Sequence, residues 1–453
     1  MSMQSRRDLF QAHRLMTQRA ALALLRGEPD VPDQPLRRAN VGTFSGVLVA
    51  VIAVAAFGIW GLLDHGAPSL KYDASTPTLI IDKQTGAPYV FCETDHRDIC
   101  PMVNVSSARL ALQSTSPLNV ETVNQSSLSS VPHGPELGIP GLPQDLPGPS
   151  LLAEQPWSAC TETRIGVPGV GTQVMTAVAG GIATGGQPLG SDALLVSDSS
   201  GQDWVIWDNT RMSVTAATLG LVFPEQQPVS VPSKWLNSIQ QGAAFQAPSI
   251  PGQGTLVTGP AGTRVKVGQL YTEDGTSQNF VMLQDGDVAP ITPLQDSLLS
   301  VESPQQLQLA PSALLSHEGP PLAADGLPAT KPAVSAAASP FCVTYSGRGP
   351  VLAMQVETGG QMAPVPASVS TTTSQVFYIA LPSGSASLVQ ETGDNISYFL
   401  VTGGVRYPLE SAAVAVYLGY SPSQAVQLPP GVVEEIPVGP SFNLSQARDV
   451  VQP

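Results

Sequence analysis

The chain has 453 residues, of which 42% are hydrophobic and only 12% are charged, and its formal net charge is −15. With 42 Gly and 43 Pro, the composition favours many short strands joined by turns over long helices. The first 40 residues hold seven Arg and four acidic residues, which leaves 13 basic and 31 acidic residues in the rest of the chain. An acidic body repels phosphate backbones, so the charge excludes nucleic acid as a partner.

The first predicted element is a helix over residues 5–27. Apolar residues recur there at spacings of three and four, with Arg residues between them, which is the pattern of an amphipathic helix. Ser5 can cap its first turn, and Glu28 followed by Pro29 ends it. A basic amphipathic helix close to a membrane lies on anionic lipid or packs on a protein partner, and the pattern does not choose between these two.

The second predicted element is a transmembrane helix over residues 41–63. This run of 23 residues contains no charge, and about 20 helical residues span a hydrocarbon core. Signal peptides have apolar stretches of only about 7–15 residues, so we expect an uncleaved, single-pass anchor. Arg37 and Arg38 precede the run and the next basic residue is Lys71, so the positive-inside rule predicts that residues 1–40 are cytoplasmic. The large C-terminal part is then periplasmic, on the outer side of the inner (plasma) membrane.

All four cysteines follow the membrane segment, in the compartment where disulfides persist. Cys92 and Cys100 flank a polar turn between two apolar stretches, which favours a hairpin disulfide and leaves Cys160 to pair with Cys342. Four cysteines allow three connectivities in all. A metal site at Cys92, His96 and Cys100 is the alternative, but its spacing lacks the paired halves of a structural zinc site.

The region after the membrane segment repeats one pattern four times. An apolar strand is followed by a polar turn, a second short strand and a stretch of small residues that ends in Leu. The four copies begin at Tyr89, Trp204, Phe280 and Tyr398. Similar Pro-rich segments follow three copies and begin at Val131, Val231 and Leu428. One such unit cannot cover its own apolar face, so we expect the units to stack or pair.

Motifs that carry chemistry are absent from the sequence. It has no G-x4-G-K-[ST] phosphate loop, no G-x-S-x-G nucleophile elbow and no H-E-x-x-H zinc motif. The five histidines are scattered over the chain, and a triad or metal cage needs several of them on well-placed elements. They are His13, His65, His96, His133 and His317. We therefore predict no catalytic, cofactor-binding or metal-binding residues.

Several stretches of this sequence resemble the EccB family, a core membrane component of actinobacterial type VII (ESX) secretion systems. The first is SRRDLFQAHRLMTQRAALALLRGEPDVPDQPLRR, from Ser5, which a membrane segment follows at once. Three more are IIDKQTGAPYV from Ile80, NVSSARL from Asn104 and GIPGLPQDLP from Gly138. The two well-separated cysteines, Cys160 and Cys342, also fit the family pattern, and the match runs along essentially the whole chain.

The resemblance implies a fold and a set of partners. It implies a mainly β fold with short helices, in which one transmembrane helix precedes an elongated periplasmic part. That part has four repeats around a central domain pinned by Cys160–Cys342. The implied partners are the EccC motor ATPase, EccD, EccE and a membrane-anchored subtilisin-like protease, with self-association of the periplasmic part. The cytoplasmic helix would dock these partners, and the residues expected to do so are Arg6, Arg7, Leu9, Phe10, Arg14, Met16 and Arg19.

The expected domain division follows from the repeats and the cysteines. The ranges are 1–40 for the cytoplasmic helix and linker, 41–63 for the membrane helix, 64–150 for repeat 1, 151–184 for the first central segment, 185–250 for repeat 2, 251–335 for repeat 3, 336–370 for the second central segment and 371–453 for repeat 4. Within this division, residues 303–340 are rich in Pro, Ala, Ser and Gly, which is typical of a linker or a poorly ordered loop.

The function predicted from these observations is a non-enzymatic scaffold of a secretion complex. Members of the resembled family are often described as ATPases, so ATP with Mg²⁺ is the alternative cofactor. A domain outside the cytoplasm meets little ATP, however, and the sequence lacks a phosphate-binding loop. A second alternative is a membrane-anchored module that binds the cell wall, because the family's repeat fold is similar to a cell-wall-binding subunit of a phage lysin.

Overall fold

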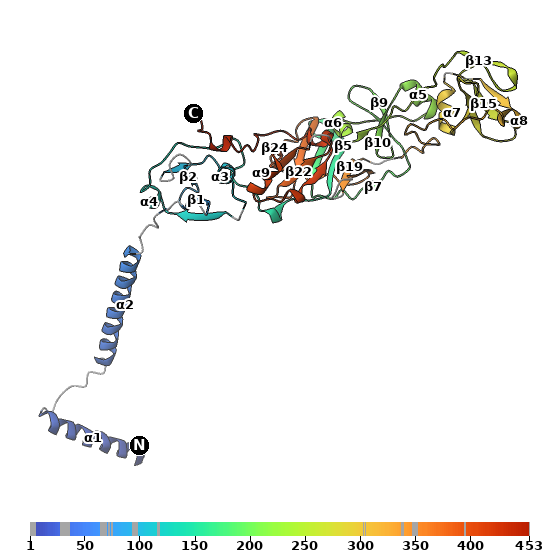
Figure 1. Cartoon of the computed structure of the whole chain (residues 1–453). Coiled ribbons are helices and arrows are strands. Elements are labelled where there is room, and N and C mark those ends of the chain that lie inside the picture. The colour runs from blue at the N-terminus through green and yellow to red at the C-terminus, as the bar shows by residue number, and fades with distance from the viewer. Residues whose placement is uncertain are drawn as a thin grey trace. The chain divides into compact units, whose positions relative to one another are not determined.

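The computed structural model describes residues 6–27, 37–63, 70, 73, 76–92, 98–115, 118–301, 303, 305–336, 339–346, 352–393 and 396–452. The chain divides into two compact units, Met1–Ser69 and Leu70–Pro453. The first unit holds two helices, α1 (Arg6–Arg26) and α2 (Arg37–Leu63), and every described strand belongs to the second unit (Figure 1). The prediction of a mainly β fold with short helices and one long apolar helix is confirmed.

Helix α1 ends one residue earlier than the sequence predicted. Gly27 has a φ of 68°, and its N–H donates to the Ala23 carbonyl at 2.9 Å. A left-handed residue directly after the last turn stops a helix, and glycine adopts that conformation without steric cost. The predicted cap Ser5 and the predicted stop at Glu28 lie outside the described residues.

Four sheets in the second unit share one strand order. In each, three strands form an antiparallel meander, a short helix follows, and a fourth strand returns parallel to the first. Repeat 1 consists of β1 (Thr78–Asp82), β2 (Pro88–Phe91), β3 (Ile99–Pro101), α3 (Val105–Leu112) and β4 (Asn119–Val123). Repeat 2 consists of β8 (Leu194–Ser197), β9 (Asp203–Trp207), β10 (Thr210–Val214), α5 (Ala216–Val222) and β11 (Val229–Ser230).

The other two copies follow the same order. Repeat 3 consists of β15 (Leu270–Glu273), β16 (Asn279–Met282), β17 (Val288–Ile291), α7 (Pro293–Leu299) and β18 (Gln306–Leu309). Repeat 4 consists of β22 (Ser387–Glu391), β23 (Tyr398–Thr402), β24 (Val405–Leu409), α9 (Ala412–Tyr417) and β25 (Val426–Leu428). The four sequence copies identified above correspond to the second strand, third strand and helix of each repeat.

Each repeat continues with a second short helix and a segment that closes the sheet edge. The helices are α4 (Gln125–Leu128), α6 (Ser233–Asn237), α8 (Pro311–Leu314) and α10 (Pro430–Val433). The closing segments add to the third strand of each repeat in parallel fashion, through His133 and Leu137, through β12 (Gln240–Gln241), through Glu318, and through Val438 and Phe442. Each repeat therefore covers one of its two exposed sheet edges.

The expectation of a linker or poorly ordered loop over residues 303–340 is wrong for residues 306–314. These residues contain β18 and α8. Leu309 and Leu314 are 7% and 4% exposed and pack in one apolar cluster with Tyr271 and Phe280. Burial of these side chains holds a Pro-rich segment in place that composition alone does not distinguish from a linker.

A six-stranded sheet forms the centre of the second unit, in the order β21-β6-β5-β19-β20-β7. Its strands are β5 (Trp157–Val167), β6 (Gly171–Gly180), β7 (Gln187–Pro188), β19 (Phe341–Ser346), β20 (Ala353–Thr358) and β21 (Gln375–Ala380). The expected boundaries of the central domain were too narrow, because β7 falls in the range expected for repeat 2 and β21 in that expected for repeat 4. The sheet to which a strand belongs depends on the strand with which it pairs. That partner is distant in the sequence, so the local pattern does not reveal it.

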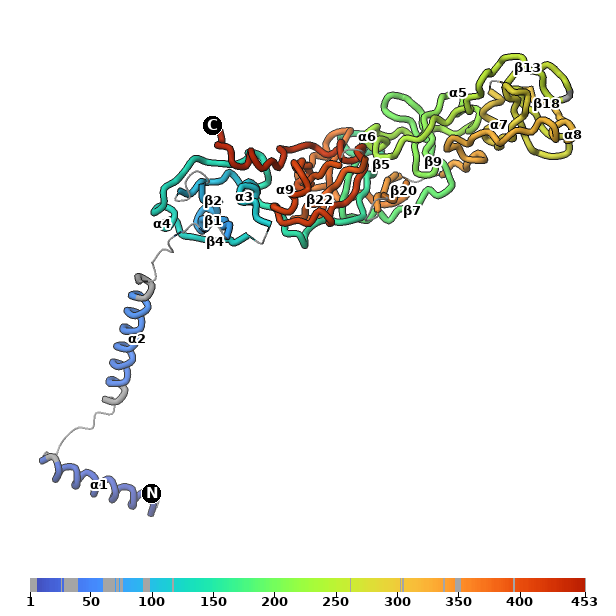
Figure 2. Tube along the Cα trace, in the orientation of Figure 1, coloured from blue at the N-terminus to red at the C-terminus, as the bar shows by residue number. Residues whose placement is uncertain are grey.

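The repeats cover their apolar faces by packing on one another and on the central sheet. Repeats 1 and 4 share one apolar cluster, to which α3 contributes Leu110 and α9 contributes Val414. Repeats 2 and 3 share another, to which α5 contributes Leu219 and α7 contributes Leu298. The largest cluster joins the central sheet to repeats 2 and 4 and includes Trp235. The C-terminal segment returns along repeat 1, where Val450 bridges to Leu137 (Figure 2).

Further short elements lie outside these sheets and repeats. A hairpin of β13 (Leu256–Thr258) and β14 (Arg264–Lys266) precedes repeat 3. Helix η1 (Pro149–Leu151) precedes the central sheet, and η4 (Gln446–Arg448) lies close to the C-terminus and contacts α3.

Candidate membrane and partner-binding elements

Helix α2 has the length and composition of a membrane span. The stretch Asn40–Ile59 is apolar enough to cross a bilayer, and none of it is buried inside the protein. Large apolar side chains such as Phe44, Val54 and Phe57 are 82%, 73% and 78% exposed. Water would penalise such a surface strongly, whereas lipid tails accommodate it.

Helix α1 carries all seven residues predicted to dock partners. Leu9 and Met16 are two turns apart and share a face, while Arg7 and Arg14 share the opposite face. Leu9, Phe10 and Met16 are 63%, 69% and 75% exposed, so in the part of the chain that the structure describes no element covers the apolar side of this helix. These residues lie on α1 as expected, and their role in docking partners stays a prediction.

Two disulfide bonds are present, Cys92–Cys100 and Cys160–Cys342. Cys160 and Cys342 lie directly opposite each other on β5 and β19, with their Cα atoms 4.0 Å apart. Both are buried, and 182 positions separate them in the sequence. This bond therefore joins the two chain segments that build the central sheet. The turn between Cys92 and Cys100, which includes His96, lies outside the described residues.

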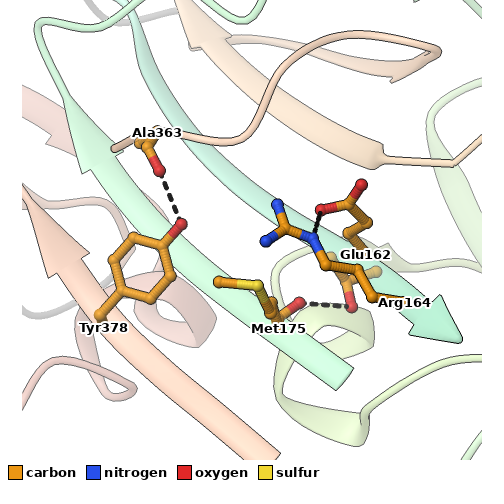
Figure 3. A network of polar contacts seen from close by, with 6 residues as sticks. Glu162, Arg164, Met175, Ala363 and Tyr378 are labelled. Atoms are coloured by element: carbon orange, nitrogen blue, oxygen red, sulfur yellow. Dashed lines mark hydrogen bonds and ion pairs between the residues drawn. The ribbon is translucent and has the colours of Figure 1, made fainter. Parts of the chain in front are cut away.

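Polar contacts hold a covering segment on one face of the central sheet (Figure 3). The Tyr378 hydroxyl on β21 donates to the Ala363 carbonyl at 2.6 Å, and burial raises the pKa of Tyr378 to about 12. Tyr378 therefore stays neutral at any physiological pH and acts as a structural hydrogen-bond donor. In the same region, Arg164 of β5 pairs with Glu162 at 2.6 Å.

Two of the stretches that carry the family resemblance bind each other. Asn104 caps α3 by accepting a hydrogen bond from the Ser107 amide at 2.7 Å, and its amide group donates to the Ile139 carbonyl at 3.0 Å. The Ser107 hydroxyl accepts from the Ile139 amide at 3.0 Å, and Ser106 donates to the Pro143 carbonyl at 2.6 Å. NVSSARL and GIPGLPQDLP are therefore two sides of one buried polar contact. Sequence reasoning identified the stretches but not this contact.

A third stretch, IIDKQTGAPYV, is the β1–β2 hairpin. The buried Asp82 carboxylate accepts from the Thr85 hydroxyl at 2.6 Å and from the Gln84 amide at 3.0 Å. These hydrogen bonds, first that from Thr85, hold the pKa of Asp82 below its ordinary value. Gly86 closes the turn with a φ of 74°, a conformation that favours glycine.

The described residues contain no group of three or more His, Cys, Asp or Glu side chains placed to hold a metal ion. The described histidines lie apart from one another: His13 is on α1, His133 packs edge-on against Tyr89 in repeat 1, and His317 lies 3.7 Å from Asp287 in repeat 3. The exposed apolar side chains of the first unit lie on the amphipathic helix α1 and on the apolar helix α2.

One apolar helix of membrane-spanning length, joined to four like-folded repeats on a disulfide-pinned sheet, defines a membrane-anchored repeat protein. The family model for "Type VII secretion system ESX-1, transport TM domain B" matches residues 2–451. The chain therefore belongs to the EccB family.

Curated relatives come from several ESX systems. The ESX-2 secretion system ATPase EccB2 of Mycobacterium tuberculosis is 29% identical over 492 aligned positions, which cover 99% of this chain and 96% of the relative. The ESX-3 secretion system ATPase EccB3 of Mycolicibacterium smegmatis is 27% identical over 281 residues. That match covers 58% of this chain and 51% of the relative, so it spans about half of that protein's length.

Solved structures share the fold. A chain of an intact ESX-5 inner membrane complex superposes with a TM-score of 0.61 at 22% identity, and the match covers 100% of this chain and 96% of that chain. The EccB3 dimer from the ESX-3 core complex gives a TM-score of 0.62 at 21% identity, over 83% of this chain and 100% of that chain. At these identities the likeness establishes the fold.

Proposed function

We propose that this protein is a structural core subunit of a type VII (ESX) secretion complex in the inner membrane. The observation that carries the proposal is the family match over residues 2–451, which takes in the membrane helix and all four repeats in one order. The solved structures of the same fold are subunits of an ESX-5 inner membrane complex and an EccB3 dimer, which supports membership of a membrane complex and formation of a homo-oligomer.

Helix α2 spans the membrane in this proposal, with α1 in the cytoplasm and the repeats in the periplasm. Arg37 and Arg38 begin α2, and basic residues flanking a span stay on the cytoplasmic side. Both disulfides lie in the second unit, and such bonds persist in an oxidising compartment.

The cytoplasmic helix docks the other subunits of the complex. Its exposed apolar face and its Arg residues suit a protein partner, and the proposed partners are EccC, EccD and EccE. A membrane-anchored subtilisin-like protease is proposed to associate on the periplasmic side, where the four repeats and the central sheet mediate self-association.

The docking role is tested by reversing the charge of α1. Arg6, Arg7, Arg14 and Arg19 are replaced by Glu in the full-length chain, and the complex is purified through a tag on this subunit. We expect the cytoplasmic partners to be lost while melting of the β-rich unit stays unchanged, because α1 belongs to a separate compact unit. The control reverses Lys83, Arg264 and Lys266, exposed basic residues of the second unit, and should retain the partners. Retention of the partners by the α1 variant would refute docking through these arginines.

A second candidate function comes from the names of the relatives, which call them ATPases. The sequence of this chain has no G-x4-G-K-[ST] motif, the loop that cradles phosphates in most nucleotide hydrolases. We therefore propose a scaffold in preference to an enzyme.

A further inference from the structure

The outer edge of β21 has no partner strand in the part of the chain that the structure describes. There, β21 pairs with β6 alone. The Val174 amide of β6 donates to the carbonyl of Ser374, the residue just before β21, at 2.8 Å. Alternate residues of a parallel strand direct their N–H and C=O groups to the same neighbouring strand. The even-numbered residues of β21 therefore direct these groups to β6. The N–H and C=O groups of Tyr378 thus point to β6, and those of Phe377 and Ile379 point away from the sheet.

This edge forms one side of a groove of about 810 Å³. Residues 364–369 line it on the face of β21 that carries Tyr378, and the turn at residues 403–404 of repeat 4 lines it on the face that carries Ile379. These two segments are its walls. Two hydrogen bonds hold the segments that line the groove. Tyr378 donates to the carbonyl of Ala363, which directly precedes residues 364–369 (Figure 3). Thr402, which directly precedes the turn at residues 403–404, donates to the Ser385 carbonyl at 3.3 Å. Among the described residues, no strand pairs with β21 on its groove side.

We propose that this groove binds one extended peptide segment of a partner protein, which adds to β21 as a seventh strand of the central sheet. A row of unpaired backbone donors and acceptors on a sheet edge is a template for a further strand. An added strand would satisfy the outward groups of Phe377 and Ile379, and its alternate side chains would face the two walls.

The two walls of the groove admit a single peptide to the edge of β21 and exclude the edge of a second folded copy. β21 is recessed between residues 364–369 and the turn of repeat 4, and in another copy the same edge would be recessed in the same way. Two recessed edges cannot approach to the roughly 4.8 Å spacing of paired strands. A single extended chain can enter the groove, because it brings no flanking walls of its own.

The charge of the groove and of the whole chain limits which peptides can bind. Asp145 is the one charged side chain among the lining residues, which are otherwise mostly Pro, Ser, Gly, Ala and larger apolar residues. The whole chain carries a net charge of −15, so an acidic segment is repelled. The ligand is therefore an extended segment without acidic residues.

The test uses the full-length chain in lipid nanodiscs and a defined probe. The probe is an acetylated peptide of alternating Thr and Val with one terminal Lys, and its control is the same peptide with every amide N-methylated. Binding is followed by fluorescence anisotropy, and amide hydrogen exchange is resolved at Phe377, Tyr378 and Ile379. At saturation we expect exchange at Phe377 and Ile379 to slow by about tenfold or more, because their N–H groups gain partners, while Tyr378 stays unchanged.

Two variants place the peptide in the groove. Ser368 is exposed and lines the groove, whereas Ser370 is exposed and does not line it. Ser368→Trp fills the groove and should abolish binding, and Ser370→Trp should bind as the unchanged protein does. Absence of binding at about 1 mM peptide, equal binding of the N-methylated control, or unchanged exchange at Phe377 and Ile379 would each overturn the proposal.

Discussion

At the scale of single residues, Asn104 joins the start of helix α3 to the loop at Ile139 in repeat 1. Its side chain is fully buried, caps α3 and also binds the Ile139 carbonyl. One amide side chain therefore satisfies a helix N–H and a loop carbonyl that would otherwise be buried without partners.

Asn104→Ala should destabilise the second unit by about 2–3 kcal/mol, since it removes a helix cap and leaves two buried groups unpaired. Asn124 provides a matched control, because it precedes α4 without making a side-chain cap. Asn124→Ala should change stability by less than about 0.5 kcal/mol. The measurement is thermal or denaturant unfolding of both variants, and similar losses in the two would contradict the capping role.

Asp82 makes the β1–β2 hairpin sensitive to acid. Its pKa is lower in the folded protein than its ordinary value of 3.8. A depressed pKa stabilises the fold at a pH above the unfolded value, and this stabilisation is lost as the pH falls through the folded value. Asp82→Asn should therefore lower the melting temperature at about pH 7 and lose this effect near about pH 2–3. Asp449→Asn, at an exposed position, is the control; a pH-independent difference between wild type and Asp82→Asn would argue against this role.

At the scale of elements, the two disulfides close loops of very different length. Cys160 and Cys342 are 182 positions apart and join β5 to β19, whereas Cys92 and Cys100 are 8 positions apart. The longer loop restricts the unfolded chain more, so its bond contributes more stability if loop entropy dominates.

Replacing both Cys160 and Cys342 by Ser should cost about 5 kcal/mol in the chain-entropy description, against about 2–3 kcal/mol for replacing both Cys92 and Cys100. Unfolding of the two double variants under oxidising conditions measures both losses. An equal or smaller loss for the Cys160–Cys342 variant would show that loop entropy does not govern this bond.

At the same scale, the short helices α6 and α10, each preceded by a proline, join repeats 2 and 4. A Cβ atom on Gly431 of α10 would lie 2.1 Å from the Asn237 carbonyl oxygen of α6, so only glycine permits this approach. Lys234 of α6 pairs with Glu435 at 3.0 Å beside the same contact, and Tyr345 of the central sheet donates to the Ser238 carbonyl. The Pro-rich segments that looked alike in the sequence, from Val231 and Leu428, thus pack on each other.

At the scale of the whole molecule, the chain builds repeats 1 to 3 in order and then returns. Repeat 4 packs on repeat 1, repeat 3 packs on repeat 2, and the central sheet lies against repeats 2 and 4. Repeats 1 and 4 therefore bury their apolar helix faces on a partner that is distant in sequence, whereas repeats 2 and 3, which follow each other in the chain, pack on each other. This arrangement suits a scaffold, because the repeats bury their apolar faces on one another.

The whole-molecule prediction concerns nucleotide turnover. The purified full-length chain, freed of any motor ATPase, should hydrolyse ATP no faster than a heat-inactivated sample, because the scaffold needs no phosphate site. The measurement is phosphate release with Mg²⁺ present, together with equilibrium binding of a fluorescent ATP analogue. Saturable turnover that a point substitution in this chain abolishes would favour the enzyme named among the relatives.

The sequence predicted the parts of this protein that depend on local pattern. The membrane helix follows from an uninterrupted apolar run, because spanning a bilayer requires length and hydrophobicity alone. The second strand, third strand and helix of each repeat were recognised because their apolar strand, polar turn and small-residue stretch are contiguous. The first strands of repeats 1 and 4 could also have been predicted from the sequence. Each contains a pair of apolar residues between polar ones, in Thr78–Asp82 and in Ser387–Glu391.

Only the tertiary structure decided which strands share a sheet. β21 belongs to the central sheet because it pairs with β6, and β18 and α8 are ordered because Leu309 and Leu314 find an apolar cluster. Likewise, the bond between Asn104 and the Ile139 carbonyl joins stretches 35 positions apart. Sheet pairing and burial are interactions with distant partners, whereas a sequence pattern records only what neighbouring residues favour. The sequence by itself therefore determined the family, the membrane span and the repeated unit, and the packing of the folded chain decided the central sheet, the pairing of the repeats and the open edge of β21.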